Sequence, residues 1–132
     1  MDLEKALIIP KAIRSKTAQL KRLNEMKIAI RTADPSQTPA QGGPQAKSKL
    51  EEICAEIDEI ERDIYESIKE YRQYLKDLEK EIDKFRGPEH LFLRYRYLCG
   101  MSYPKIAQEM HYTVREIYYI RDKVCTKFHS NT

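Results

Sequence analysis

The side chains best suited to recognition chemistry lie near the end of the chain, between Thr113 and Phe128. At about 100° per residue of an α-helix, one side of this segment is apolar, formed by Ile117, Ile120, Val124 and Phe128. The opposite side carries Arg115, Tyr118, Tyr119, Asp122 and Thr126. A guanidinium can make a bidentate contact with O6 and N7 of guanine, and tyrosines donate to phosphates or pack on thymine methyl groups. These residue types at this spacing predict a helix that reads DNA.

Further residues could add affinity for phosphates. Thr113 and the free N–H groups at the start of the helix favour an anion. Lys105, Lys123 and Lys127 would attract phosphates without regard to sequence, and Arg94 and Arg96 are weaker candidates on a preceding helix. We therefore expect DNA contacts from Lys105, Thr113, Val114, Arg115, Tyr118, Tyr119 and Lys123.

The same residues allow other interpretations at this stage. The two tyrosines could instead pack against a long helix elsewhere in the chain, and Arg115 could pair with Glu116 or Asp122 on the surface. Asp122 is unfavourable near phosphates, so it must lie beyond the DNA edge or accept a hydrogen bond from cytosine.

The residues before this segment complete the pattern of a helix-turn-helix. Ser102 can cap a helix that contains Pro104, and Thr113 with Glu116 forms a capping box at the start of the next helix. The small residue expected where two such helices cross is Ala107. The turn usually favours Gly because its backbone is left-handed, and this chain has His111 there. The core positions are all uncharged: Ile106, Met110, Tyr112, Ile117 and Ile120. An earlier helix is expected from Pro88 to the turn at Gly100.

The run from Leu93 to Phe128 resembles region 4 of bacterial sigma-70-type factors. The matching elements are Leu93-Arg94-Tyr95, Gly100, Lys105-Ile106-Ala107, Thr113 through Ile120, and Val124 with Phe128. Together with a long charged helix in a short chain, this is similar to phage late-gene transcription regulators of the ArpU/RinA type. The resemblance implies an activator that binds promoter DNA and recruits host RNA polymerase in the bacterial cytoplasm. Two copies joined through the long helix would form a homodimer. Nothing in the chain corresponds to the sigma segments that bind the −10 promoter element, so a complete sigma factor is not implied.

Residues 47–86 predict one long helix of roughly 55 Å. Apolar residues follow one another at steps of three and four from Leu50 to Phe85, close to a heptad repeat with one stutter near Ile64 and Ile68. Gly87-Pro88 is expected to end the helix. The apolar stripe must pack on residues 11–32, on the C-terminal segment or on another copy of the chain. The pattern favours a coiled-coil homo-oligomer.

The complete fold expected is all-α, with an N-terminal helix and a long coiled-coil-like helix joined to a C-terminal helix-turn-helix. The first region, residues 1–32, holds a basic amphipathic helix over residues 11–32, with Pro10 at its first position. Residues 33–46 hold three Pro and two Gly with almost no bulky apolar residues, which predicts a linker. The long helix, residues 47–86, and the DNA-binding domain, residues 87–132, follow. The net charge is positive over residues 1–46, negative over residues 47–86 and positive over residues 87–132.

Composition argues against several classes of protein. Three cysteines far apart in 132 residues disfavour a disulfide framework or a zinc site, and His90, His111 and His129 lack metal-ligand spacing. No run of about 18 apolar residues exists, and the N-terminus is too short and acidic for a signal peptide, so we expect no membrane partner. No nucleophile with a partnered base and no Gly-rich phosphate loop is present, so neither an enzyme nor a cofactor is expected.

Two alternative functions stay open. The chain could be a phage interaction or inhibitor protein that uses the acidic long helix on a helix-turn-helix scaffold. It could also be a small terminase-like DNA-packaging subunit. A tight partner that binds without DNA would favour the first alternative, and ring formation would favour the second.

Overall fold

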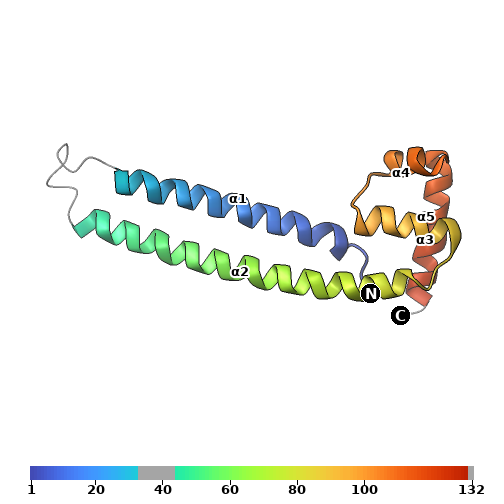
Figure 1. Cartoon of the computed structure of the whole chain (residues 1–132), viewed down its shortest axis with the longest axis horizontal. Coiled ribbons are helices and arrows are strands. Elements are labelled where there is room, and N and C mark those ends of the chain that lie inside the picture. Colours follow the sequence, from blue (N-terminus) through green and yellow to red (C-terminus); the bar gives the residue numbers. More distant parts are fainter. Residues whose placement is uncertain (33–43, 131–132) are drawn as a thin grey trace. The chain divides into compact units, whose positions relative to one another are not determined.

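The computed structural model describes residues 1–32 and 44–130, and within these ranges the chain is helical with no strand. The elements are α1 (Lys5–Thr32), α2 (Pro44–Ile82), α3 (Gly87–Leu93), the π-helical turn η1 (Arg94–Leu98), α4 (Tyr103–Met110) and α5 (Val114–Ser130) (Figure 1). The predicted all-α fold with one long helix is confirmed. None of the described helices is long and apolar enough to cross a membrane.

The chain divides into two compact units, to which α1 and α2 both contribute. One unit, called here the helix-pair unit, consists of residues 11–69. The other, called the C-terminal unit, consists of residues 1–10 together with residues 70–132.

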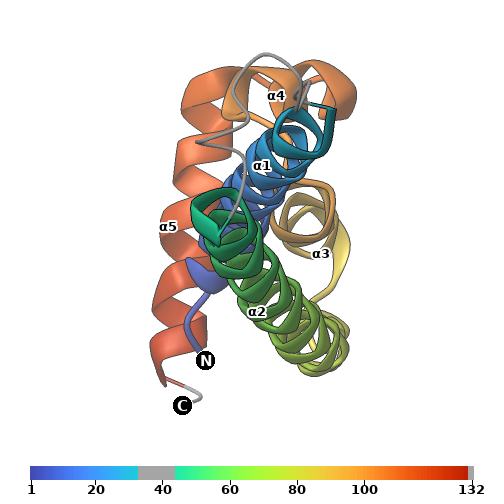
Figure 2. The same cartoon turned by 90° about the vertical axis from the view of Figure 1, so that its left-hand side faces the viewer.

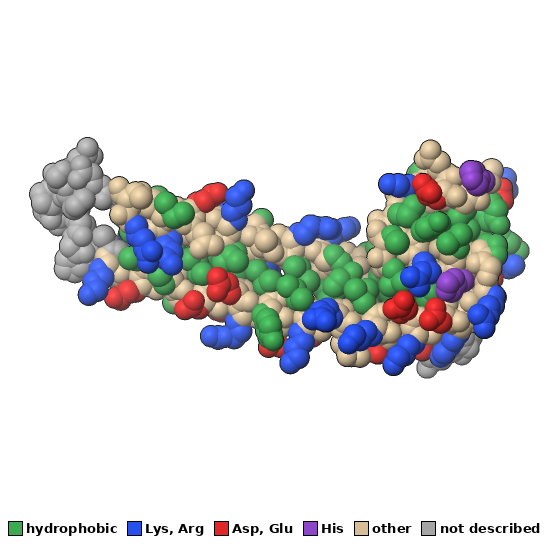
Figure 3. Space-filling model, viewed as in Figure 1, with side chains coloured by type: hydrophobic (Ala, Val, Ile, Leu, Met, Phe, Trp, Pro, Cys, Tyr) green, Lys and Arg blue, Asp and Glu red, His purple; other side chains and the backbone are tan. Residues whose placement is uncertain are grey.

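In the helix-pair unit, the two long helices lie side by side (Figures 1 and 2). The buried residues Leu23, Ile53 and Ile57 form a small cluster, flanked by half-buried Leu20, Ile30 and Ile60. The ammonium of Lys16 donates to the Ser67 hydroxyl at 3.3 Å. In Figure 3, apolar side chains follow the line where the two helices meet, with charged side chains beside them. Of the three predicted partners for the stripe, the helix over residues 11–32 therefore covers this part.

The boundary predicted for the first helix is wrong. Helix α1 begins at Lys5 rather than at residue 11, so Pro10 lies inside it rather than at its first position. Proline in a helix interior removes one backbone hydrogen bond and crowds the preceding turn. The turn before Pro10 is held by packing instead, because Ala6 is buried in the core of the C-terminal unit and Leu3 and Leu7 pack against that core.

Both ends of the long helix also differ from the prediction. Helix α2 begins at Pro44, a residue type favoured at the first helical position, so residues 44–46 are helix rather than linker. The rest of the predicted linker, residues 33–43, lies outside the described residues. The helix ends at Ile82, before Gly87, because the chain turns at residues 83–86 and directs Phe85 onto Phe128, with ring centroids 5.1 Å apart.

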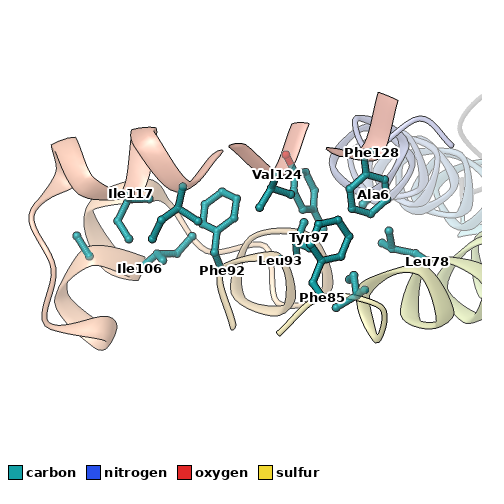
Figure 4. Close-up of a cluster of buried hydrophobic side chains, with 13 residues drawn as sticks. Ala6, Leu78, Phe85, Phe92, Leu93, Tyr97, Ile106, Ile117, Val124 and Phe128 are labelled. Carbon is teal, nitrogen blue, oxygen red and sulfur yellow. The ribbon is translucent and has the colours of Figure 1, made fainter. Parts of the chain in front are cut away.

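The core of the C-terminal unit joins all of its helical elements (Figure 4). Its fully buried side chains are Leu78, Ile82, Phe92, Leu93, Ile106, Ile117 and Val124. The N-terminal residues are tied to it through the Tyr74 hydroxyl, which donates to the Asp2 carbonyl at 2.6 Å. Burial raises the pKa of Tyr74 to about 12. The first residues of the chain are therefore held in place by residues more than 70 positions later.

The predicted helix from Pro88 to Gly100 is present, but its last turn is π-helical. The Cys99 N–H donates to the Arg94 carbonyl at 3.0 Å, and Gly100 then takes a left-handed conformation at φ +69°. Within this widened turn Tyr97 is 4% exposed and packs edge-on against Phe92.

Candidate nucleic-acid interface

Helices α4 and α5 and the short turn between them form the predicted helix-turn-helix. His111 ends α4 in a left-handed conformation, with φ 59° and ψ 38°. The Tyr112 N–H donates to the Ala107 carbonyl at 2.9 Å, which closes the turn. Among the described residues other than glycine, His111 alone has a positive φ. The turn is thus built as expected although its residue is not Gly.

Both predicted caps are present. The Ser102 hydroxyl accepts from the Lys105 N–H at 3.4 Å. At α5 the Thr113 hydroxyl accepts from the Glu116 N–H at 3.1 Å, and the Glu116 carboxylate accepts from the Thr113 N–H at 3.4 Å and from its hydroxyl at 3.1 Å. This reciprocal box fixes the direction in which α5 leaves the turn.

The contact between α4 and α5 is closely packed. Ala107 is 4% exposed, as expected at a crossing where a larger side chain would separate the helices. Ile106 and Ile117 are fully buried and Ile120 nearly so, while Met110 and Tyr112 are half-buried. The predicted core face of α5 is confirmed over its whole length, since Val124 and Phe128 are buried too.

One exposed flank of α5 carries a group of rings and guanidinium ions. The Tyr118 and Tyr103 rings lie 5.0 Å apart, so Tyr118 packs on α4 rather than on the long helix. Arg121 lies 4.8 Å from the centre of the Tyr118 ring, and Arg96 lies 4.4 Å from that of Tyr103. Such cation–π contacts hold rings and cations in fixed positions.

Arg121 also forms an ion pair with Asp122, the residue whose negative charge is unfavourable near phosphates. Its guanidinium donates to the Asp122 carboxylate at 2.9 Å, and this hydrogen bond raises the pKa of Arg121. The carboxylate is thereby neutralised on the exposed surface of α5. Sequence reasoning missed Arg121, although its position three residues after Tyr118 was a signal for a contact on one helix face.

The other exposed flank of α5 borders a hollow of about 680 Å³. Its walls include Phe85, Arg86, Pro88, Tyr112, Tyr119 and Lys123. The Tyr119 side chain is 63% exposed, and the Lys123 ammonium lies 5.1 Å from the centre of its ring. We call this feature the basic hollow.

The structure therefore separates the predicted DNA contacts into groups. Arg115 is exposed in the first turn of α5 and makes no hydrogen bond or ion pair within the described residues, so neither Glu116 nor Asp122 holds it. Val114 is 38% exposed beside it, and Thr113 is occupied by the cap. Lys105 is exposed in the first turn of α4. Tyr118 lies on the ring-and-guanidinium flank, while Tyr119 and Lys123 lie at the basic hollow.

Three cations predicted to attract phosphates also have protein partners. The Lys127 ammonium contacts the Glu89 carboxylate at 2.8 Å, and Arg94 pairs with Glu79 at 3.5 Å. Arg96 donates to the Met101 carbonyl at 2.9 Å and stacks on Tyr103. These partners come from other elements or from the turn after η1, which helix periodicity does not reveal.

Searches against known proteins give no independent assignment: no family model, no curated protein and no solved structure matches this chain. Among the described residues, no group of three His, Cys, Asp or Glu side chains is placed to hold a metal ion.

Proposed function

We propose that this protein is a sequence-specific regulator of transcription that binds double-stranded DNA through α5. The observation that carries the proposal is the exposed, unpaired Arg115 in the first turn of a helix whose start is fixed by the Thr113–Glu116 box. In a helix-turn-helix, the first residues of the second helix are those that reach base edges in the major groove. A guanidinium held there is suited to guanine.

Other exposed side chains of α4 and α5 could position the protein on the DNA backbone through phosphate contacts. Lys105 is exposed at the start of α4, where it could contact a phosphate, and Tyr118 is 41% exposed. The Arg121–Asp122 pair removes the repulsion that a free carboxylate would exert on the phosphates. Phosphate contacts of this kind set register, while base contacts give specificity.

The regulatory role rests on the resemblance to sigma region 4 and to phage late-gene regulators. On that basis the protein is a homodimer that acts in the bacterial host cytoplasm and activates late genes by recruiting host RNA polymerase. A dimer would present two copies of α5 to half-sites about 34 Å apart, one helical turn of DNA. Exposed apolar side chains of the helix-pair unit, Met26, Ile28, Tyr65 and Ile68, provide surface for a second copy.

The test is a salt titration of binding to DNA that flanks the protein's own gene, compared with a random duplex. We expect the flanking DNA to bind at least ~10³-fold more tightly. Arg115→Ala should remove most of this preference, whereas Arg14→Ala, which removes an exposed arginine of α1, should leave it unchanged. Equal, weak binding of both duplexes would contradict the proposal.

A second candidate is a protein-interaction role for the acidic helix α2. It is favoured by Tyr65 and Ile68, which are 66% and 43% exposed among carboxylates on that helix. Tyr65→Ser with Ile68→Ser would then abolish binding of a protein partner in the absence of DNA. The same double variant should retain the Arg115-dependent DNA preference if the regulator proposal is correct.

A further inference from the structure

The basic hollow has the size and lining of a small-ligand site. Ligand sites in proteins are clefts of roughly 300–1,000 Å³ with apolar walls and a few polar groups, and this hollow measures about 680 Å³. It lies wholly within the C-terminal unit, between the turn after α2, the start of α3 and one flank of α5. Its floor includes Phe85, which is 8% exposed and stacked on Phe128.

The charges around the basic hollow are not balanced. Two carboxylates line it, and both have partners: Glu89 contacts Lys127 at 2.8 Å, and Glu116 belongs to the cap with Thr113. Lys84 contacts Glu81 at 3.0 Å. Arg86 and Lys123 line the same hollow and form no ion pair within the described residues. Glu116 keeps its negative charge, because its Thr113 partners are neutral donors, but four cations and two carboxylates line the hollow, so an anion that enters meets a net positive charge.

Two tyrosine rings in the lining offer an aromatic surface to a ligand. Tyr119 is 63% exposed, and the half-buried Tyr112 also lines the hollow. The Lys123 ammonium lies over the Tyr119 ring, so the hollow presents a cation next to an aromatic ring. A ligand that combines a flat ring with an anionic group would use both features. Bases stack readily on exposed aromatic side chains, whatever their sequence.

We propose that the basic hollow binds one nucleotide unit, with the base against Tyr119 and the phosphate between Arg86 and Lys123. Tyr119 and Lys123 are also among the predicted duplex contacts, so Arg86, which is not, separates this function from duplex reading. The unit could be a free nucleoside monophosphate or an unpaired nucleotide of a DNA strand. Both have the same ring and phosphate, and their binding can be told apart directly.

The experiment measures binding to the full-length protein by equilibrium dialysis at low salt. The probes are deoxyadenosine monophosphate, deoxyadenosine, inorganic phosphate, and a single-stranded oligodeoxyadenylate. We expect saturable binding of the monophosphate, with deoxyadenosine and phosphate each at least about tenfold weaker, because each lacks one of the two contacts. Binding of the oligonucleotide as well identifies an unpaired strand as a source. Its failure to bind identifies the free nucleotide.

The variants are Arg86→Gln and Tyr119→Leu, with Arg72→Gln on α2 as the matched control. The Arg86 side chain makes no capping bond to α3, so its replacement leaves the helix start intact. Arg86→Gln and Tyr119→Leu should each weaken monophosphate binding about tenfold or more, and Arg72→Gln should not change it. Thermal unfolding of each variant checks that the fold is retained.

Three outcomes would overturn the nucleotide site. The first is the absence of saturable binding by both the monophosphate and the oligonucleotide. The second is binding that neither variant weakens. The third is Arg86-dependent binding of an acidic aromatic peptide, added as a further probe, without nucleotide binding. Arg86→Gln should keep the duplex preference, and Arg115→Ala should keep monophosphate binding. Failure of this site and failure of the proposed regulator function are thus separate results.

Discussion

The C-terminal unit and the helix-pair unit are built from similar amphipathic helices but enclose very different cores. In the C-terminal unit, helices that meet from several directions bury seven side chains almost completely. In the helix-pair unit the buried residues are Leu23, Ile53 and Ile57, each still 5–7% exposed. Two helices can cover one line of contact but cannot surround a side chain. A defined site for recognition therefore belongs to the C-terminal unit.

Matched leucine substitutions should show the largest difference between the units. Leu93→Ala in the C-terminal unit removes a side chain with 0% exposure, and Leu23→Ala removes one with 7%. Leu→Ala changes in cores cost about 2–5 kcal/mol, more where the surroundings cannot collapse. We expect Leu93→Ala near the top of that range and Leu23→Ala near its bottom, measured by urea unfolding. Equal losses would mean that the two cores are equally enclosed.

Enlarging a small residue should separate the units further. Ala107→Leu places extra atoms where α4 meets α5 and should cost about 1–3 kcal/mol of unfolding free energy, because Ala107 is 4% exposed. It should also reduce DNA binding by moving α5. Ala29→Leu on the exposed face of α1 should change stability by no more than about 0.5 kcal/mol. A tolerated Ala107→Leu would contradict the close crossing.

Threonine hydroxyls act differently in the two units. Thr113→Ala removes the cap of α5 and should cost about 1 kcal/mol. The Thr17 hydroxyl instead donates to the Ile13 carbonyl inside α1 at 2.8 Å, a contact that does not stabilise a helix. Thr17→Ala should be neutral or stabilise by a few tenths of a kcal/mol, since Ala favours helix. Thermal unfolding of both variants is the measurement, and a costly Thr17→Ala would argue against this distinction.

The smallest expected effect is a dependence on alkaline pH in the C-terminal unit. Burial raises the pKa of Tyr74 from 10.0 to about 12, so its phenol holds the proton more tightly in the folded chain. Its contribution to stability is complete below pH 10 and is lost as the pH rises towards 12. Tyr74→Phe should make the alkaline loss of stability less steep, as measured by urea unfolding at several pH values. Part of the alkaline loss of stability should remain in Tyr74→Phe, because burial also raises the pKa of Tyr97.

Local signals were sufficient to predict the helix-turn-helix. The Ser102 cap, the Thr113–Glu116 box and the small Ala107 each act within a few residues, so the sequence contains all the partners. The left-handed His111 was also predicted, because the spacing of the flanking helices left only that position for the turn. The existence of the long helix followed from its uninterrupted apolar repeat.

The errors arose where distant residues decide the structure. Pro10 inside α1 depends on the packing of Ala6 into a core made by residues after 70. The end of α2 at Ile82 depends on the stacking of Phe85 on Phe128. Lys127 pairs with Glu89, a residue on another helix. A periodicity argument contains none of these partners, so it misplaced the helix ends and did not find the ion pair of Lys127.

The π-helical turn from Arg94 to Leu98 gives this part of the chain an unusual tolerance to changes of length. A π turn contains one residue more than the α-helical turn that it replaces. Removal of one half-buried residue there, while Tyr97 is kept, would restore regular α-helix and leave Phe92 and Leu93 facing the same core. A deletion within α5 would instead rotate every following side chain by about 100°. A one-residue deletion should therefore be tolerated better before Gly100 than within α5.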